Sequence, residues 1–177
     1  MGVIFLAGVH GVGKGFLGAK AANALGIYHL TASQLIREEK GQATWTADKK
    51  TSDLDDNQLA LIRAVSRRRQ SHSSILLDGH FVLRNGNGVL TPLESNVFKE
   101  LHLDGVVLLV DETNVIASRL ALRDNVQTDL GAMYELAEAE SSHARTICDE
   151  LKLPFIEIYK PNEVILADSI KQLLIPR

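Results

Sequence analysis

The chain has 177 residues, 45% of them hydrophobic and 23% charged, with a formal net charge of -3. That length suits one domain with a sizeable core, and the mildly acidic balance argues against broad electrostatic binding to nucleic acid. A single cysteine, Cys148, excludes an internal disulfide and a cysteine-built zinc site. No apolar run approaches the roughly 20 residues that span a bilayer, so we expect a cytoplasmic protein without a membrane partner.

An apolar run over residues 3–7 leads directly into a glycine-rich turn with the spacing G-x-x-x-x-G-K. Glycines there let the backbone adopt positive φ and approach phosphate oxygens, and the unpaired amides at the start of the next helix attract a polyphosphate. Lys14 is placed to reach the β- and γ-phosphates of ATP. The alternative is a glycine-rich strand-to-helix turn with an incidental lysine. The residues predicted to bind ATP are Gly8, Val9, His10, Gly11, Val12, Gly13, Lys14, Gly15 and Phe16.

Apolar runs and helical patterns alternate along the rest of the chain. After the loop we expect, in order, a helix over 16–25, a strand over 27–30, a helix over 34–39 capped by Thr31 or Ser33, a polar loop over 40–52 and a helix over 53–70. The second half continues with a strand over 73–78, a hairpin over 81–90, a helix over 92–102, a strand over 105–110, a helix over 112–123, a polar link over 124–129, a helix over 130–151, a strand over 154–159 and a helix over 162–174.

The predicted fold follows from this alternation. The unbroken apolar strand at 105–110 is typical of a parallel sheet that is covered on both faces. Strands and helices that alternate without a linker predict one domain, 1–177, built on such a sheet. We therefore predict an α/β fold, a P-loop three-layer sandwich with a mainly parallel five-stranded sheet, helices on both faces, an added hairpin and a minimal lid.

Asp78 ends the apolar strand at 73–78, and His80 follows two residues later. Ligands of a doubly wound sheet sit at the carboxyl ends of its strands, so Asp78 is predicted to emerge beside the phosphate loop, where it could hold Mg²⁺ directly or through water. The alternative for Asp78 is a capping role in the turn. His80 could hydrogen-bond an acceptor hydroxyl or phosphate, or it could hold the hairpin by a bond to the backbone.

Several cationic side chains are candidates for binding anions. Arg119 and Arg123 are four residues apart on a predicted helix, so both guanidinium groups could converge on one anion, or both could be solvated cations of a last helical turn. The run Arg67-Arg68-Arg69 is either a solvated helix end or a ligand cluster. Trp45, in the polar loop, could stack on a base or anchor the loop.

Three stretches together resemble the adenylate kinase-like nucleoside and nucleotide kinases, a P-loop family. They are Gly8–Gly15, the segment Thr31–Arg37 after a short strand, and Leu76–Gly79, followed one strand later by the arginine pair. The resemblance implies an acceptor-side helical segment over 31–72 and a short lid over 119–129. It also implies that Lys14, Arg119 and Arg123 stabilise the transferring phosphoryl group, that Arg37 holds an acceptor phosphate, and that Arg145 is a weaker candidate for the same charge cluster.

The chain departs from that family's pattern at three places, one of which is the short lid, with only about five residues between Arg123 and Asp129. Phe16 stands where the family has a hydroxyl residue that contacts phosphate or Mg²⁺. After Asp78 and Gly79 the family usually places Pro-Arg two residues further on, whereas the nearest arginine here is Arg84. These departures leave the fold and the ATP site as predicted and concern the acceptor.

The function predicted from these features is an ATP-dependent phosphotransferase of the nucleoside monophosphate kinase type, which uses ATP and Mg²⁺ and phosphorylates a small acceptor that we expect to be a nucleotide. The alternative is a nucleotide-binding regulatory module or slow ATPase that acts on a protein partner. A kinase for an RNA or DNA end shares the fold, but no basic patch with interleaved aromatic residues supports it.

Overall fold

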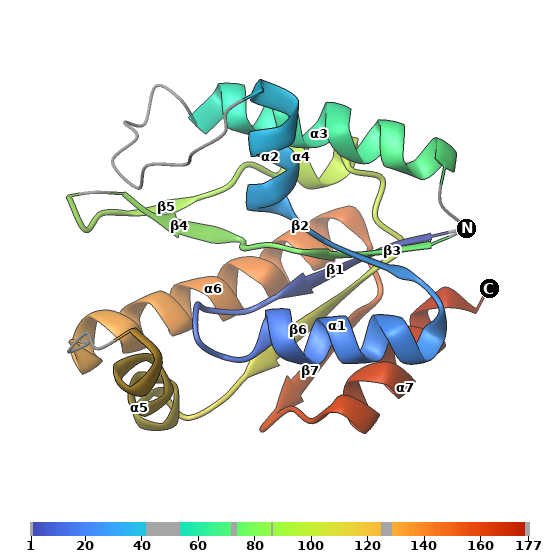
Figure 1. Cartoon of the computed structure of the whole chain (residues 1–177). Coiled ribbons are helices and arrows are strands. Elements are labelled where there is room, and N and C mark those ends of the chain that lie inside the picture. The colour runs from blue at the N-terminus through green and yellow to red at the C-terminus, as the bar shows by residue number, and fades with distance from the viewer. Residues whose placement is uncertain (1, 42–53, 72–73, 86, 125–128, 176–177) are drawn as a thin grey trace.

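A computed structural model describes residues 2–41, 54–71, 74–85, 87–124 and 129–175. Its centre is a parallel five-stranded sheet with the order β2-β3-β1-β6-β7, as predicted (Figure 1). Most of the predicted loop over 40–52, with Trp45, and most of the link over 124–129 lie outside the described residues. The strands are β1 (Gly2–Ala7), β2 (Tyr28–Thr31), β3 (Ser74–Asp78), β6 (Gly105–Val110) and β7 (Phe155–Tyr159).

Helices cover both faces of the sheet and bury it in two separate cores (Figure 1). Because successive side chains of a strand point to opposite faces, Phe5 of β1 packs into one core and Leu6 into the other. The Phe5 face is covered by α2 (Ala32–Lys40), α3 (Leu54–Ser71), α4 (Ser95–Glu100) and α6 (Leu130–Leu151). The Leu6 face is covered by α1 (Lys14–Leu25), α5 (Thr113–Asp124) and α7 (Glu163–Leu174).

The predicted hairpin forms a second, antiparallel sheet beside the main one. Its strands are β4 (Val82–Arg84) and β5 (Leu90–Pro92), and both contact α6. Because Pro92 pairs with Val82 in this ladder, the helix expected from residue 92 begins only at Ser95, and that part of the prediction was wrong. The N-cap of α2 is Thr31 rather than Ser33, since its hydroxyl accepts a hydrogen bond from the Gln34 amide at 3.3 Å.

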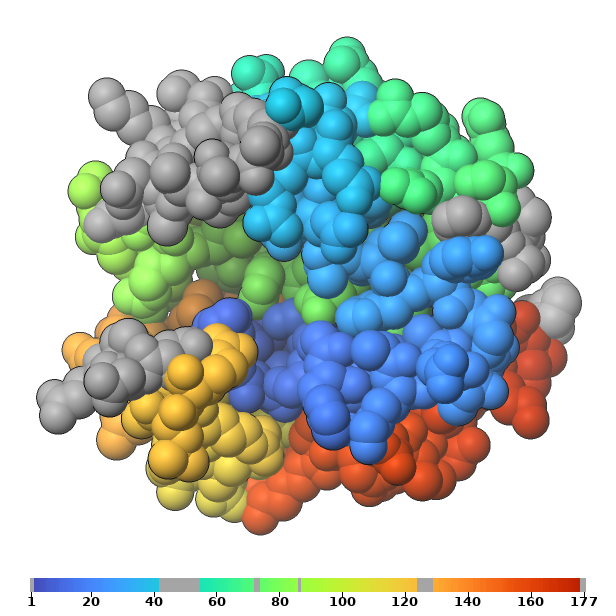
Figure 2. All heavy atoms as spheres, viewed as in Figure 1, coloured from blue at the N-terminus to red at the C-terminus, as the bar shows by residue number. Residues whose placement is uncertain are grey.

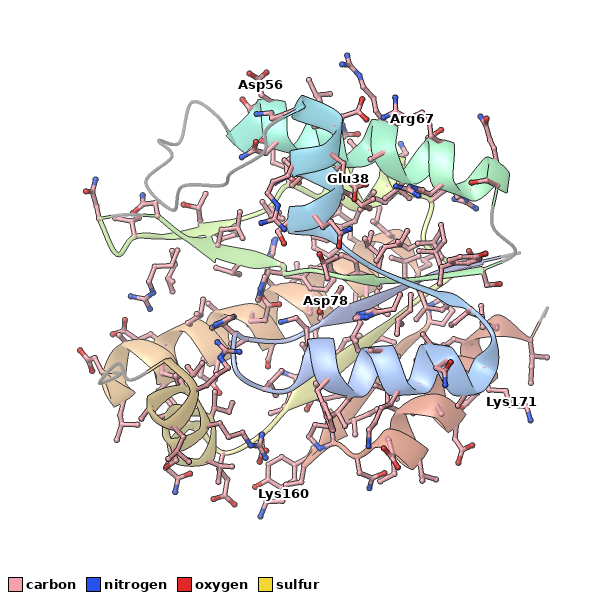
Figure 3. All side chains as sticks on the ribbon, viewed as in Figure 1. Glu38, Asp56, Arg67, Asp78, Lys160 and Lys171 are labelled. Carbon is pink, nitrogen blue, oxygen red and sulfur yellow. The ribbon has the colours of Figure 1, made fainter. Side chains whose placement is uncertain are left out.

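The arginine run at the end of α3 has structural partners. Arg67 forms an ion pair with Glu39, Arg68 forms one with Glu38 at 2.8 Å, and Arg69 donates to two backbone carbonyls that follow α4. Figure 3 shows Glu38 and Arg67 on the neighbouring helices α2 and α3. These contacts hold α3 against α2 and α4, which favours a helix end over a ligand cluster, although the arginines there are paired and not only solvated.

The order of the strands determines where a ligand site can form. β1 lies between β3 and β6 in the sheet: β2 and β3 lie on one side of it, and the later strands β6 and β7 lie on the other. In doubly wound sheets, ligand sites lie outside the carboxyl ends of the strands at such a switch point. The turn at 8–13 and Asp78 therefore meet at one edge of the sheet. Among the helices described, none has the length and apolarity needed to cross a membrane.

Candidate functional site

The turn between β1 and α1 depends on its glycines. Gly8, Gly11 and Gly13 have φ values of 137°, 87° and 110°, which side-chain-bearing residues rarely adopt. A Cβ on Gly8 would lie 2.6 Å from the backbone oxygen of Leu109, and one on Gly11 would lie 2.7 Å from the side chain of Leu120. The glycine spacing seen in the sequence is therefore required by the path of the loop and by the elements that pack against it.

Lys14 places its ammonium inside this loop. The side chain is only 7% exposed, and Nζ donates to the carbonyls of Gly8 at 2.6 Å and Val9 at 3.3 Å. It also lies 3.8 Å from Oδ1 of Asp78. Burial lowers the pKa of Lys14, while the carboxylates of Asp78 and Glu140 act in the opposite direction. The loop thus holds a cation where phosphate oxygens would enter a cradle of this kind.

Asp78 ends β3 and turns toward Lys14, in the space between the sheet and the start of α1 (Figure 3). Its second oxygen lies 3.8 Å from Nε2 of His29, a nitrogen that has no hydrogen-bond partner among the described residues. Burial raises the pKa of Asp78, against the effect of the Lys14 ammonium, and burial also lowers the pKa of His29. A carboxylate whose pKa is raised is better able to accept a proton from a substrate hydroxyl.

Glu140 of α6 is a member of this site that sequence reasoning missed. Its carboxylate is 1% exposed and accepts hydrogen bonds from the backbone amides of Gly8 at 3.2 Å, Phe81 at 2.9 Å and Val82 at 2.7 Å. Burial raises the pKa of Glu140, and these three donors with Lys14 oppose that rise. The carboxylate therefore joins the entry of the phosphate loop to the entry of the hairpin.

A signal for Glu140 was present in the sequence. The apolar stripe of α6 includes Leu136, Ala137 and Ala144, and residue 140 falls on the same face because helical positions three and four apart are neighbours. A glutamate in the middle of an apolar stripe indicates a buried charge, and a buried charge needs hydrogen-bond donors. Which donors it meets could not be read from the pattern.

Two histidines lie near the loop. His80 lines the cavity described below, and its pKa is lowered to about 3 by burial and by the nearby Lys14 and His10. His80 is therefore neutral near pH 7. Nε2 of His10 lies 2.6 Å from Nη2 of Arg123, so the His10 side chain links the loop to α5. A guanidinium can only donate, which makes this ring nitrogen the acceptor.

A cavity of about 450 Å³ extends from the loop to the space between α2, α3 and the hairpin. Figure 2 shows this face of the molecule hollowed between the hairpin and the phosphate loop. Such a volume is within the range of small-molecule sites. Predicted site residues that line it are His10, Gly11, Gly13, Lys14, Gly15, Phe16, Asp78, His80 and Arg123.

Three predicted arginines are not among the lining residues. Arg119 forms an ion pair with Asp111 at 2.9 Å, so the structure does not bring it to the cavity beside Arg123. Arg145 forms an ion pair with Glu157 of β7. Arg37 is half-buried on α2. The ion pairs of Arg119 and Arg145 direct these two guanidinium groups to carboxylates that are not part of the cavity lining.

Phe16 occupies the position of the expected hydroxyl. Its ring is 67% exposed and lies 4.7 Å from the Lys20 ammonium, at the margin of the cavity. The benzene ring has no oxygen that could bind phosphate or a cation. Any cation held at the loop would therefore depend on Asp78 and on the phosphates themselves.

Comparison with known proteins identifies the family. Residues 7–135, which include the loop, Asp78 and Arg123, match the family model of the AAA domain. The chain belongs to this family. The AAA-domain protein is 26% identical over 162 residues to an adenylate kinase from Kosmotoga olearia, a match that covers 87% of this chain and 73% of the relative.

Solved structures show the same fold in this AAA-domain protein. Shikimate kinase from Acinetobacter baumannii, in complex with shikimate, has a TM-score of 0.61 at 17% identity and covers 98% of this chain and 93% of its own. A gluconokinase from Sinorhizobium meliloti 1021 has a TM-score of 0.53 at 15% identity and covers 98% of each chain. These likenesses confirm the predicted fold, and the family match together with the adenylate kinase relative confirms the resemblance to P-loop kinases.

Proposed function

We propose that the protein is an ATP-dependent phosphotransferase that moves the γ-phosphate of ATP to a hydroxyl of a small acceptor. The observation that carries this proposal is that Lys14, Asp78 and Arg123 line one cavity at the glycine loop, with Lys14 Nζ 3.8 Å from Oδ1 of Asp78. Two cations and a carboxylate at the end of a phosphate-binding loop match the demands of phosphoryl transfer, which depends on positioning and on stabilisation of charge.

The residues act in the proposed step as follows. The acceptor oxygen attacks the γ-phosphorus, the bond between that phosphorus and the bridging oxygen of ADP breaks, and the proton of the hydroxyl passes to Asp78. Asp78 is suited to this because its pKa is raised by burial. Lys14 and Arg123 stabilise negative charge on the phosphoryl oxygens. Arg119 would join them only by leaving Asp111.

Mg²⁺ is the expected companion of ATP, and the residues fit it in part. Among the described residues no group of three or more His, Cys, Asp and Glu side chains could hold a metal ion alone. Asp78 offers one carboxylate beside the loop, so it would hold Mg²⁺ through water while the phosphates of ATP supply other ligands. When bound, the cation would neutralise charge on the phosphates.

Three further predictions from the sequence bear on this proposal: the kind of acceptor, the division of the chain and the location. A nucleotide acceptor, with Arg37 bound to its phosphate, is supported by the adenylate kinase relative. The solved structures with the same fold are instead named shikimate kinase and gluconokinase. We also keep the division into an acceptor-side segment over 31–72 and a lid over 119–129, and a cytoplasmic location. The single cysteine, Cys148, is a buried free thiol, which fits a reducing compartment.

The test is a pair of lysine variants of the same helix. Lys14→Ala removes the buried ammonium, and Lys20→Ala removes an exposed one that pairs with Glu163 at 2.7 Å. ADP release from MgATP is measured with and without a panel of acceptors. We expect Lys14→Ala to lose at least 100-fold in kcat, by analogy with the removal of other charge-stabilising groups, and Lys20→Ala to stay within twofold. Near-normal turnover by Lys14→Ala would overturn the proposal.

A further inference from the structure

The half of the cavity away from the phosphate loop is predominantly apolar. Its floor includes Phe5 and Phe98, whose ring centroids are 5.6 Å apart in an edge-to-face arrangement, and both rings are almost fully buried. Phe98 in turn stacks on Phe81 at 4.4 Å. The remaining apolar lining residues of this half are Ile36, Leu61, Leu83, Leu93, Val97 and Leu101. A wall of this kind fits a flat, apolar body better than a charged group.

Gln58 is the polar side chain that points to a ligand in this apolar half. It lies near the start of α3, is 8% exposed and lines the cavity. Its Oε1 is buried and has no hydrogen-bond partner among the described residues. The adjacent Asn57 differs, because its Oδ1 accepts a hydrogen bond from Lys40 Nζ at 2.6 Å. A buried amide oxygen without a partner is costly, so a ligand with an N–H donor would satisfy it.

The charges along the cavity are unevenly distributed. The cations Lys14 and Arg123 lie at the loop, where the phosphates of ATP would use them. Between the loop and the apolar half stands the carboxylate of Asp78, and the neighbouring His80 is neutral near pH 7. A negatively charged acceptor in the apolar half would lie near this carboxylate and bury its own charge among hydrophobic side chains, which is unfavourable because the described residues that line this half include no cation.

We propose that the acceptor is an uncharged alcohol with a flat ring that carries an amide-like edge, the chemistry of a nucleoside without a phosphate. Its ring lies against Phe98 and Leu61, its N–H meets Oε1 of Gln58, and its hydroxyl points to Asp78. This inference rests on the proposed function and replaces the nucleotide expected from the sequence with a neutral substrate of the same site. Nothing in it requires Arg37, which lies outside the lining.

The first experiment compares matched acceptors. Each common nucleoside and its 5′-monophosphate are offered with MgATP, alongside shikimate and gluconate, and both ADP release and the phosphorylated product are measured. At least one nucleoside should exceed its own monophosphate and both carboxylates at least tenfold in kcat/KM. A monophosphate or a carboxylate as the best acceptor overturns the inference but leaves the phosphotransferase in place.

A binding experiment distinguishes an error in the acceptor class from an error in the proposed function. The same compounds are titrated by calorimetry in the presence of Mg²⁺ and a non-hydrolysable ATP analogue. If a nucleoside binds at least tenfold more tightly than its monophosphate while no product forms from any acceptor, the acceptor class stands and the proposed function fails. If no nucleoside binds, the inference fails.

A variant of Gln58 tests the recognition directly. Gln58→Leu keeps the approximate volume and removes the amide, and Gln70→Leu makes the same change at an exposed position of the same helix. We expect Gln58→Leu to raise the KM for the nucleoside at least tenfold and to leave the KM for ATP unchanged. The melting temperature should stay the same or rise. An equal change in both KM values, or no change in either, would contradict the role given to Gln58.

Discussion

Glu140 provides the sharpest test of how this site is built. Replacing it by Ala removes the hydrogen-bond acceptor of three backbone amides, those of Gly8, Phe81 and Val82. Because Glu140 is only 1% exposed, these amides are also shielded from water. Each buried donor left unsatisfied costs about 1–3 kcal/mol. Allowing for relaxation and entry of water, we expect Glu140→Ala to lose about 3–5 kcal/mol, a large share of the roughly 5–15 kcal/mol that keeps a domain folded.

Glu140→Gln is the more informative change because it preserves shape. One oxygen can still accept from Phe81 and Val82, whose bonds to Oε2 are 2.9 and 2.7 Å long, but the amide nitrogen then faces the N–H of Gly8. We expect a loss of about 2 kcal/mol, concentrated at the phosphate loop. For a chain of this length, that corresponds to a fall in melting temperature of about 4–8 °C.

The assay measures unfolding in urea together with the kinetic constants for ATP, and Glu138→Gln, an exposed site on the same helix, is the control. If Glu140 positions the loop, Glu140→Gln raises KM for ATP at temperatures where the variant is fully folded, and Glu138→Gln changes neither quantity. A Glu140→Gln protein within 0.5 kcal/mol of the parent in stability and unchanged toward ATP would refute this reasoning.

The remaining predictions concern four other positions: His80, Arg123, Arg119 and Phe16. Because the pKa of His80 is about 3 in the folded chain and about 6.5 when unfolded, its stabilising effect is complete above pH 6.5 and is lost as the pH falls toward 3. At pH 5 the loss should be about 1 kcal/mol after allowance for partial exposure, and urea titrations of His80→Gln should show a flatter profile between pH 6.5 and 4. Arg123→Ala should lower kcat at least tenfold in steady-state assays, whereas Arg119→Ala should lower kcat less and mainly lower the melting temperature, because Asp111 is left buried without its partner. Phe16→Thr should lower KM for MgATP at limiting Mg²⁺ with little change in melting temperature, because the ring it replaces is 67% exposed.

Local patterns in the sequence were sufficient for much of the fold. The apolar runs, the helix caps and the glycine spacing each depend on residues close together in the chain, and they predicted the parallel sheet, the hairpin and the glycine loop that leads into α1. The position of Asp78 beside Lys14 also followed, because parallel strands bring their carboxyl ends to one edge. The helix start at Ser95 was missed because a proline near a helix start looks the same in the sequence whether or not it also pairs with another strand, as Pro92 does with Val82.

Only the tertiary structure decided which side chains share the cavity. Glu140 meets Gly8 across 132 positions of sequence, Gln58 reaches the cavity from a helix whose pattern shows no ligand signal, and Arg119 and Arg123 find different partners although they are one turn apart. A helical pattern determines which face of a helix is buried, but not what the other elements place opposite each residue. For this protein the sequence alone therefore determined the phosphate-binding loop and its sheet, while the packing of α3, α5 and α6 around them determined the chemistry offered to an acceptor.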